Sequence, residues 1–112
     1  MMFTPSEYLE EFSYLSDYVR EDWLGFSVIT GAAAKLLGDE YSVPAERELC
    51  LRLIRDLLAE GARAGDFSEA LPGNPFVPWE LDAAGTLARI RAELEALGKS
   101  PDSGDVCWFR TV

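Results

Sequence analysis

Residues 44–67 read PAERELCLRLIRDLLAEGARAGDF, and this stretch decides the fold. Its first part places apolar residues at helical spacing after a proline, and a glycine follows at position 61. Proline is favoured in the first turn of a helix and glycine directly after the last, so we predict a helix over Pro44–Glu60. Its apolar stripe consists of Leu49, Cys50, Leu53, Ile54, Leu57 and Leu58. After Gly61, residues 62–67 are predicted to form a short strand.

The same signals predict three more helices. Thr4 and Glu7 form a capping box at the start of the first one, and apolar residues then recur at helical spacing. Two others are predicted over Phe26–Leu37 and Ala83–Leu97, and each is followed by a glycine that suits a helix end. The chain therefore reads as mostly helical.

Two more strands complete the prediction. Residues 71–75 form a turn-rich segment before Phe76–Trp79, and Pro78 should confine that strand to a sheet edge. Val106–Val112 is the strongest strand candidate, and we expect it to pair with the earlier strands. We predict a single α+β domain over residues 1–112, with about four helices and a small two- or three-stranded antiparallel sheet.

Composition excludes several classes of function. The chain has 112 residues, 20 acidic against 10 basic side chains, a net charge of −10 and no histidine. The absent histidine excludes a Ser-His-Asp triad, a Cys-His dyad and histidine-ligated zinc. The negative charge argues against nucleic acid as a partner, because contact with phosphates requires lysine and arginine. We expect a binding protein without catalytic residues, cofactor or metal.

Compartment signals are few. The N-terminal residues lack the basic region and apolar run of a secretory signal, and no segment is apolar enough to span a bilayer. We therefore expect a cytoplasmic protein without a membrane partner. Cys50 and Cys107 lie in apolar runs, and we expect both to be reduced, buried thiols.

The negative charge is concentrated near the N-terminus. Residues 1–43 contain eight acidic and two basic side chains, a net of −6, which leaves −4 for the other 69 residues. Such a face either keeps a small protein soluble or docks a basic partner. Our candidate partner-binding residues are Glu7, Glu10, Glu11, Asp17, Glu21 and Asp22. Trp79 joins them, since it follows a proline at the end of an edge strand and could be an exposed anchor.

Carboxylates alone offer little chemistry. Only Glu7 and Glu11 are spaced to share one side of a helix, and the sequence supplies neither an activated nucleophile nor a histidine to work with them. A small carboxylate-only enzyme or metal site remains an alternative that metal titration would test.

The order of the elements is similar to a winged helix, in which a helix is followed by a hairpin. DNA-reading winged helices need a basic recognition helix, whereas Arg47, Arg52 and Arg55 in the helix over 44–60 are offset by four acidic residues. A winged-helix-like adaptor or regulator with a protein partner is therefore one interpretation.

The second half resembles small bacterial immunity proteins encoded beside toxins, in polymorphic-toxin and contact-dependent inhibition systems. The resemblance covers roughly residues 50–110 and rests on Gly61, Gly65-Asp66, Phe76-Val77-Pro78-Trp79, Arg89-Ile90, Leu97-Gly98, Pro101 and Gly104-Asp105-Val106-Cys107-Trp108-Phe109. It implies a cytosolic protein that binds a cognate toxin and blocks it. A basic toxin, such as a nuclease, would suit the acidic N-terminal part.

Overall fold

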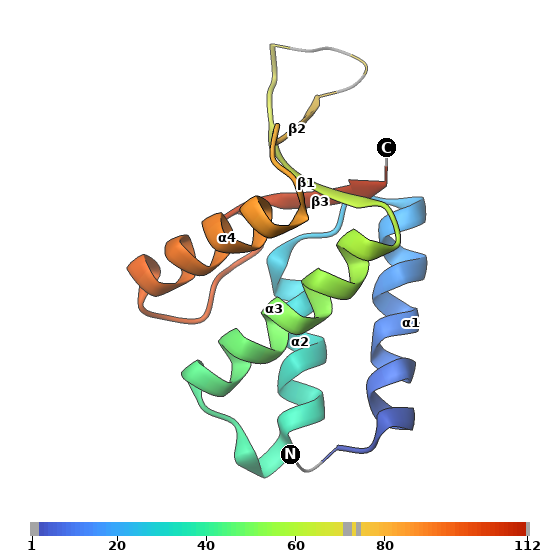
Figure 1. Cartoon of the computed structure of the whole chain (residues 1–112), viewed down its shortest axis with the longest axis vertical. Helices are drawn as coiled ribbons and strands as arrows, with labels where there is room; N and C mark the ends of the chain where they lie inside the picture. The colour runs from blue at the N-terminus through green and yellow to red at the C-terminus, as the bar shows by residue number, and fades with distance from the viewer. Residues whose placement is uncertain (1–2, 71–72, 74, 112) are drawn as a thin grey trace.

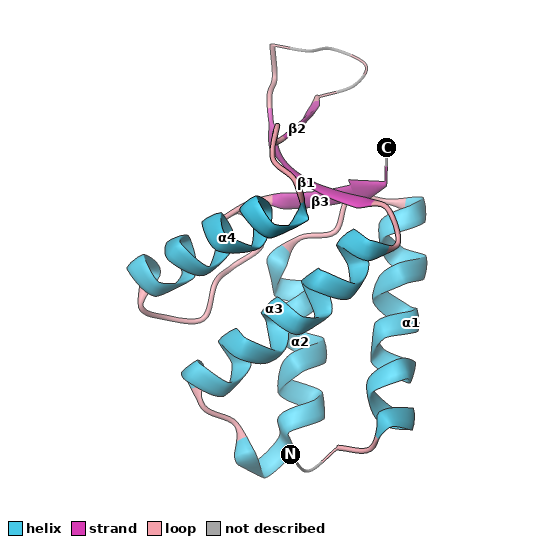
Figure 2. Ribbon diagram, viewed as in Figure 1, coloured by secondary structure: helices cyan, strands magenta, loops and turns pink. Residues whose placement is uncertain are grey.

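The computed structural model describes residues 3–70, 73 and 75–111. The helices of this part are α1 (Pro5–Glu21), α2 (Phe26–Leu37), α3 (Val43–Ala59) and α4 (Ala83–Leu97), with a 3₁₀ turn η1 (Gly38–Glu40) after α2. The strands are β1 (Ala62–Phe67), β2 (Phe76–Pro78) and β3 (Trp108–Thr111). Figures 1 and 2 show helices below a small sheet, which confirms the predicted α+β class. The predicted turn over 71–75 and the end of the last strand fall partly outside the described residues.

Side-chain caps explain where α1, α3 and α4 begin, whereas α2 follows Gly25 without one. The Thr4 hydroxyl accepts from the Glu7 amide at 3.1 Å, and the Glu7 carboxylate accepts from the Thr4 amide at 2.9 Å, so the predicted capping box is confirmed. Asp82 accepts from the Gly85 amide at 2.7 Å at the start of α4. Ser42 caps α3 at 3.1 Å, which places the helix start one residue before the predicted Pro44.

The sheet is antiparallel with the order β2-β1-β3. The hairpin pairs Gly65 with Pro78 and Phe67 with Phe76, so β2 is an edge strand as Pro78 predicted. On the other side of β1, Gly65 pairs with Trp108. The outer edge of β3 is occupied at one point by Leu24, which exchanges two backbone hydrogen bonds of 2.9 Å with Phe109.

The core lies between the helices and one side of the sheet. Leu15, Phe26, Leu53, Ile90 and Phe109 are all at most 1% exposed and come from every helix and from β3. Apolar stripes of helices and alternate strand residues meet there, as expected for a two-layer α+β domain. Helix α3 touches α1, α2, α4 and β1, and is therefore the central element.

Candidate partner-binding surface

A stripe of exposed residues runs along α1. Glu7, Glu10, Tyr14, Asp17 and Glu21 are spaced by three, four, three and four residues, so they line one side of the helix. At 1.5 Å per residue the stripe is about 21 Å long. All five residues are exposed, and the Tyr14 side chain is 54% exposed. We call these five residues the acidic stripe.

The acidic side chains around this stripe are not equivalent. Glu11 leaves it and forms an ion pair of 3.1 Å with Lys35 of α2, with only 12% of its side chain exposed. Asp17 lies 3.7 Å from Arg20. Glu10 and Glu21 form no ion pair with any residue that the structure describes. Uncompensated charge is therefore present at both Glu10 and Glu21.

The structure thus brings together four of the six predicted acidic residues. Glu7, Glu10, Asp17 and Glu21 share the stripe, whereas Glu11 turns to α2. Asp22 follows α1, and its carboxylate accepts a hydrogen bond of 2.7 Å from the Trp23 amide. The sequence analysis missed Tyr14, although its helical spacing already placed it away from the core residues.

Trp79 is not an exposed anchor, and this prediction is wrong. Its side chain is 5% exposed, and its indole N–H donates to Asp66 at 3.1 Å. The guanidinium carbon of Arg89 lies 3.6 Å from the centroid of the ring, and Arg89 is held by Glu93 at 2.9 Å. These contacts tie the hairpin to α4. Trp79 and Arg89, two of the residues that carry the resemblance, therefore have a structural role here.

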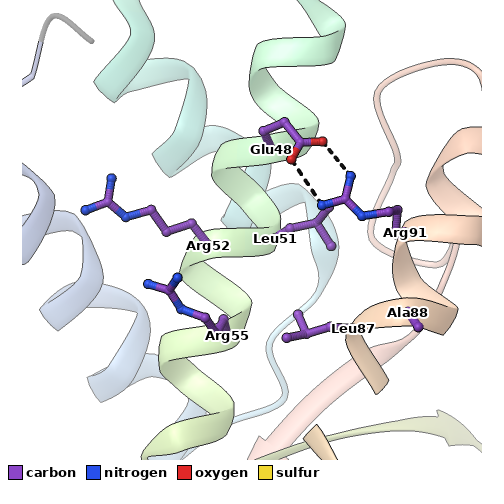
Figure 3. A pocket seen from close by; sticks show the side chains of 7 residues that line it. All are labelled: Glu48, Leu51, Arg52, Arg55, Leu87, Ala88 and Arg91. Atoms are coloured by element: carbon purple, nitrogen blue, oxygen red, sulfur yellow. Dashed lines mark hydrogen bonds and ion pairs between the residues drawn. The ribbon is translucent and has the colours of Figure 1, made fainter. Parts of the chain in front are cut away.

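An open groove of about 320 Å³ lies between α3 and α4 (Figure 3). Leu51, Leu87 and Ala88 line it together with Arg52, Arg55, Arg91 and Glu48. Its arginines are engaged: Arg91 donates to both oxygens of Glu48 at 2.7 and 3.1 Å, and Arg55 lies 3.0 Å from Asp56. Arg52 covers the ring of Tyr8 at 4.3 Å. The three arginines of the groove are therefore already engaged by other residues of the chain, and we do not assign a ligand to it.

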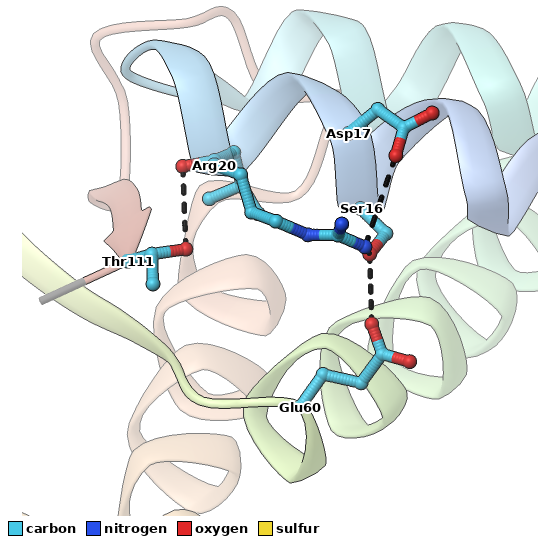
Figure 4. A network of polar contacts seen from close by, with 6 residues as sticks. Ser16, Asp17, Arg20, Glu60 and Thr111 are labelled. Atoms are coloured by element: carbon cyan, nitrogen blue, oxygen red, sulfur yellow. Dashed lines mark hydrogen bonds and ion pairs between the residues drawn. The ribbon is translucent and has the colours of Figure 1, made fainter.

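A polar network connects α1 with the end of α3 (Figure 4). The buried hydroxyl of Ser16 donates to Glu60 at 2.7 Å and accepts from Arg20 at 2.7 Å. Thr111 of β3 donates to the Val19 carbonyl at 3.4 Å beside it. The network satisfies buried polar atoms and fixes α1 against the body of the domain.

Three buried groups, Tyr8, Cys50 and Cys107, have raised pKa values, which keeps them protonated at neutral pH. Burial, followed by a hydrogen bond of 2.5 Å to Asp56, raises the pKa of the Tyr8 hydroxyl. Cys50 and Cys107 are free and buried, as predicted, and burial raises the pKa of both thiols. A thiol of raised pKa is a poor nucleophile at neutral pH. Within the described residues, no group of three or more acidic or cysteine side chains is placed to hold a metal ion.

The sequence and structure match no family model, no curated protein and no solved structure. Across the described ranges, none of the helices combines the length and apolarity that crossing a membrane requires.

Proposed function

We propose that the chain is a non-catalytic inhibitor of the immunity type, which binds a cognate bacterial toxin and covers its basic site. The observation that carries the proposal is the acidic stripe, where Glu10 and Glu21 have no ion pair among the described residues. The exposed ring of Tyr14 lies between them on the same helix side and offers an apolar contact. Tyrosine is one of the residue types that dominate binding energy in interfaces.

Rigidity supports this use of the stripe. Leu15 and Val19 bury the opposite side of α1, and the Ser16–Glu60 hydrogen bond holds the helix to α3. A surface fixed in this way loses little conformational entropy when a partner docks. The charge of −10 would also steer a basic partner toward it and raise the association rate at low salt.

The test is co-purification with the product of the adjacent upstream gene, followed by affinity measurement. Reversal of Glu10, Asp17 and Glu21 to lysine should raise Kd by on the order of a hundredfold, about 3 kcal/mol. A matched control reverses Glu69, Glu80 and Glu95, which are exposed away from α1. Both sets add three times +2, from −10 to −4, so they separate local contact from net charge.

Two results would count against the proposal. If the folded α1 triple variant keeps its affinity, the acidic stripe is not the interface. If the adjacent gene encodes no toxin, or its product forms no complex, the immunity function itself is refuted. Binding that does not weaken between low and high salt would contradict the charge-driven docking.

A further inference from the structure

The side of the sheet that faces away from the helices has an unusual composition. Residues directly opposite in a ladder share a face, and alternate residues of a strand do too. The register therefore places seven strand residues on this outer face, namely Arg63, Gly65, Phe67, Phe76, Pro78, Trp108 and Arg110. No carboxylate is among them, although 20 of the 112 residues are acidic. The outer face thus carries +2 on a chain of −10.

Aromatic rings cover this face as a cluster of their own. Trp23 packs edge-on against Phe67 and Phe76, both at 5.5 Å between centroids, and against Trp108 at 6.0 Å. Arg110 lies 5.9 Å from the Trp23 ring. Phe76 is 4% exposed and forms the buried part of the cluster, Trp23 and Trp108 are half-buried, and Phe67 is 53% exposed. The cluster therefore reaches solvent at Phe67 and at parts of the two indole rings.

Two glycines fix the positions of these rings. A Cβ on Gly65 would lie 2.7 Å from the Phe76 ring, and a Cβ on Gly25 would lie 2.9 Å from the Trp108 ring. Each ring thus rests on the backbone at a glycine. The aromatic surface is held in place before any partner arrives, which lowers the entropic cost of binding.

The two arginines of the outer face are close enough to repel each other. Arg63 and Arg110 are directly opposite each other in the β1–β3 ladder, where like charges destabilise a sheet. Neither forms an ion pair with any described residue, and Arg63 donates a hydrogen bond to the Trp79 carbonyl oxygen at 2.8 Å. Two arginines of the α3–α4 groove, Arg55 and Arg91, differ in that they have carboxylate partners.

We propose that the outer face binds a segment of another protein that carries carboxylates beside an apolar side chain. Tryptophan and arginine are enriched at binding hot spots, and acidic residues and lysine are depleted there, which matches this face. The carboxylates would pair with Arg63 and Arg110, and the apolar group would cover Phe67 and Trp108. A second copy docked face to face would bring four arginines together without a carboxylate. The proposal is independent of the acidic stripe, which takes a partner of opposite charge.

In the experiment, random peptides displayed on phage are selected for binding to the full chain, and the binding site of the enriched peptides is then mapped by NMR. Enriched peptides should contain aspartate or glutamate together with an aromatic residue or leucine. They should shift the indole signals of Trp23 and Trp108 and leave that of Trp79, which is buried and bonded to Asp66, as the internal reference.

Matched variants make the mapping decisive. Phe67→Ser and Arg110→Glu should each weaken the selected peptides by about tenfold or more. Val77→Ser is the control for the first, since Val77 is 38% exposed on the opposite face of the same hairpin. Arg55→Glu is the control for the second, with the same charge change at an exposed helix site. Both Phe67 and Arg110 contact Trp23, so the indole signal of Trp23 in each free variant is compared with that of the wild type, to separate a displaced ring from a lost contact with the peptide.

Several results would overturn the proposal. The first is an absence of enriched peptides, and the second is enrichment of basic peptides. The third is peptide-induced NMR shifts confined to the α3–α4 groove. The fourth is equal affinity of the Phe67→Ser and Val77→Ser variants for the selected peptides. Indole shifts that depend on protein concentration without peptide would assign the face to self-association and overturn it too. None of these results bears on the toxin complex, so failure here and failure of the proposed function are distinguishable.

Discussion

Replacement of Gly65 by alanine tests how tightly the sheet is built. A Cβ at this position would lie nearer than 3.0 Å to the carbonyl oxygen of Val77 and 2.7 Å from the Phe76 ring. The oxygen belongs to the backbone of the paired strand and cannot rotate away. The strand or the ring must therefore move.

The expected effect is a loss of about 2–3 kcal/mol in the free energy of unfolding, since overpacking costs about 1–3 kcal/mol and backbone contacts lie at the upper end. Urea unfolding followed by far-ultraviolet circular dichroism would measure it. With an m-value of roughly 2 kcal/mol/M, the midpoint should fall by about 1 M.

Gly31→Ala is the matched control. Gly31 is an exposed interior residue of α2, and an added Cβ would meet nothing within 4 Å. Alanine is the better helix former by about 0.8–1.0 kcal/mol, so this variant should be more stable than the wild type. A Gly65→Ala midpoint equal to or above that of the wild type would refute the reasoning about the sheet.

Two further predictions concern buried groups. Tyr8→Phe removes the hydrogen bond to Asp56 and should lower stability by about 1 kcal/mol at pH 7. Because the pKa of Tyr8 is raised on folding, its contribution is complete below about pH 10, the unfolded value, and declines above it. Unfolding midpoints from pH 8 to 11 should therefore fall less steeply in the variant, and an equal slope would contradict the assignment. Cys50 and Cys107 are 1% and 3% exposed, so both should react with a thiol reagent only as fast as the chain opens; immediate labelling of either would be inconsistent with its burial.

The helices could be predicted well because their signals are local. Thr4, Ser42 and Asp82 cap helices through amides only three residues away. The apolar spacing of α3 then needed no knowledge of its neighbours. Strand existence was also predictable, and Pro78 identified the edge strand correctly.

The positions of Trp79 and Trp108 could not be predicted in the same way. Trp79 is buried because Asp66 and Arg89, 13 and 10 positions away, supply its polar and cationic contacts. No local pattern around Trp79 contains that information. For Trp108 a signal was present, since it alternates with Phe109 and shares its face with Arg110. The alternation of residues along β3 assigns Trp108 and Phe109 to opposite faces of the sheet, but it does not show which face the helices cover.

The bridge between Leu24 and Phe109 has a consequence for biosynthesis. Its partners are 85 positions apart (109 − 24), and β3 also pairs with β1 across more than forty residues. On the ribosome, α1, α2 and α3 emerge before Phe109, whose ring packs against Phe26 of α2 in the finished domain. The apolar surface that Phe109 covers, including the Phe26 ring, therefore lacks this partner until residues 108–111 leave the exit tunnel. A product terminated before Trp108 would lack both the bridge and the buried Phe109 ring. We expect chaperones to bind it and proteases to degrade it as an incompletely folded chain.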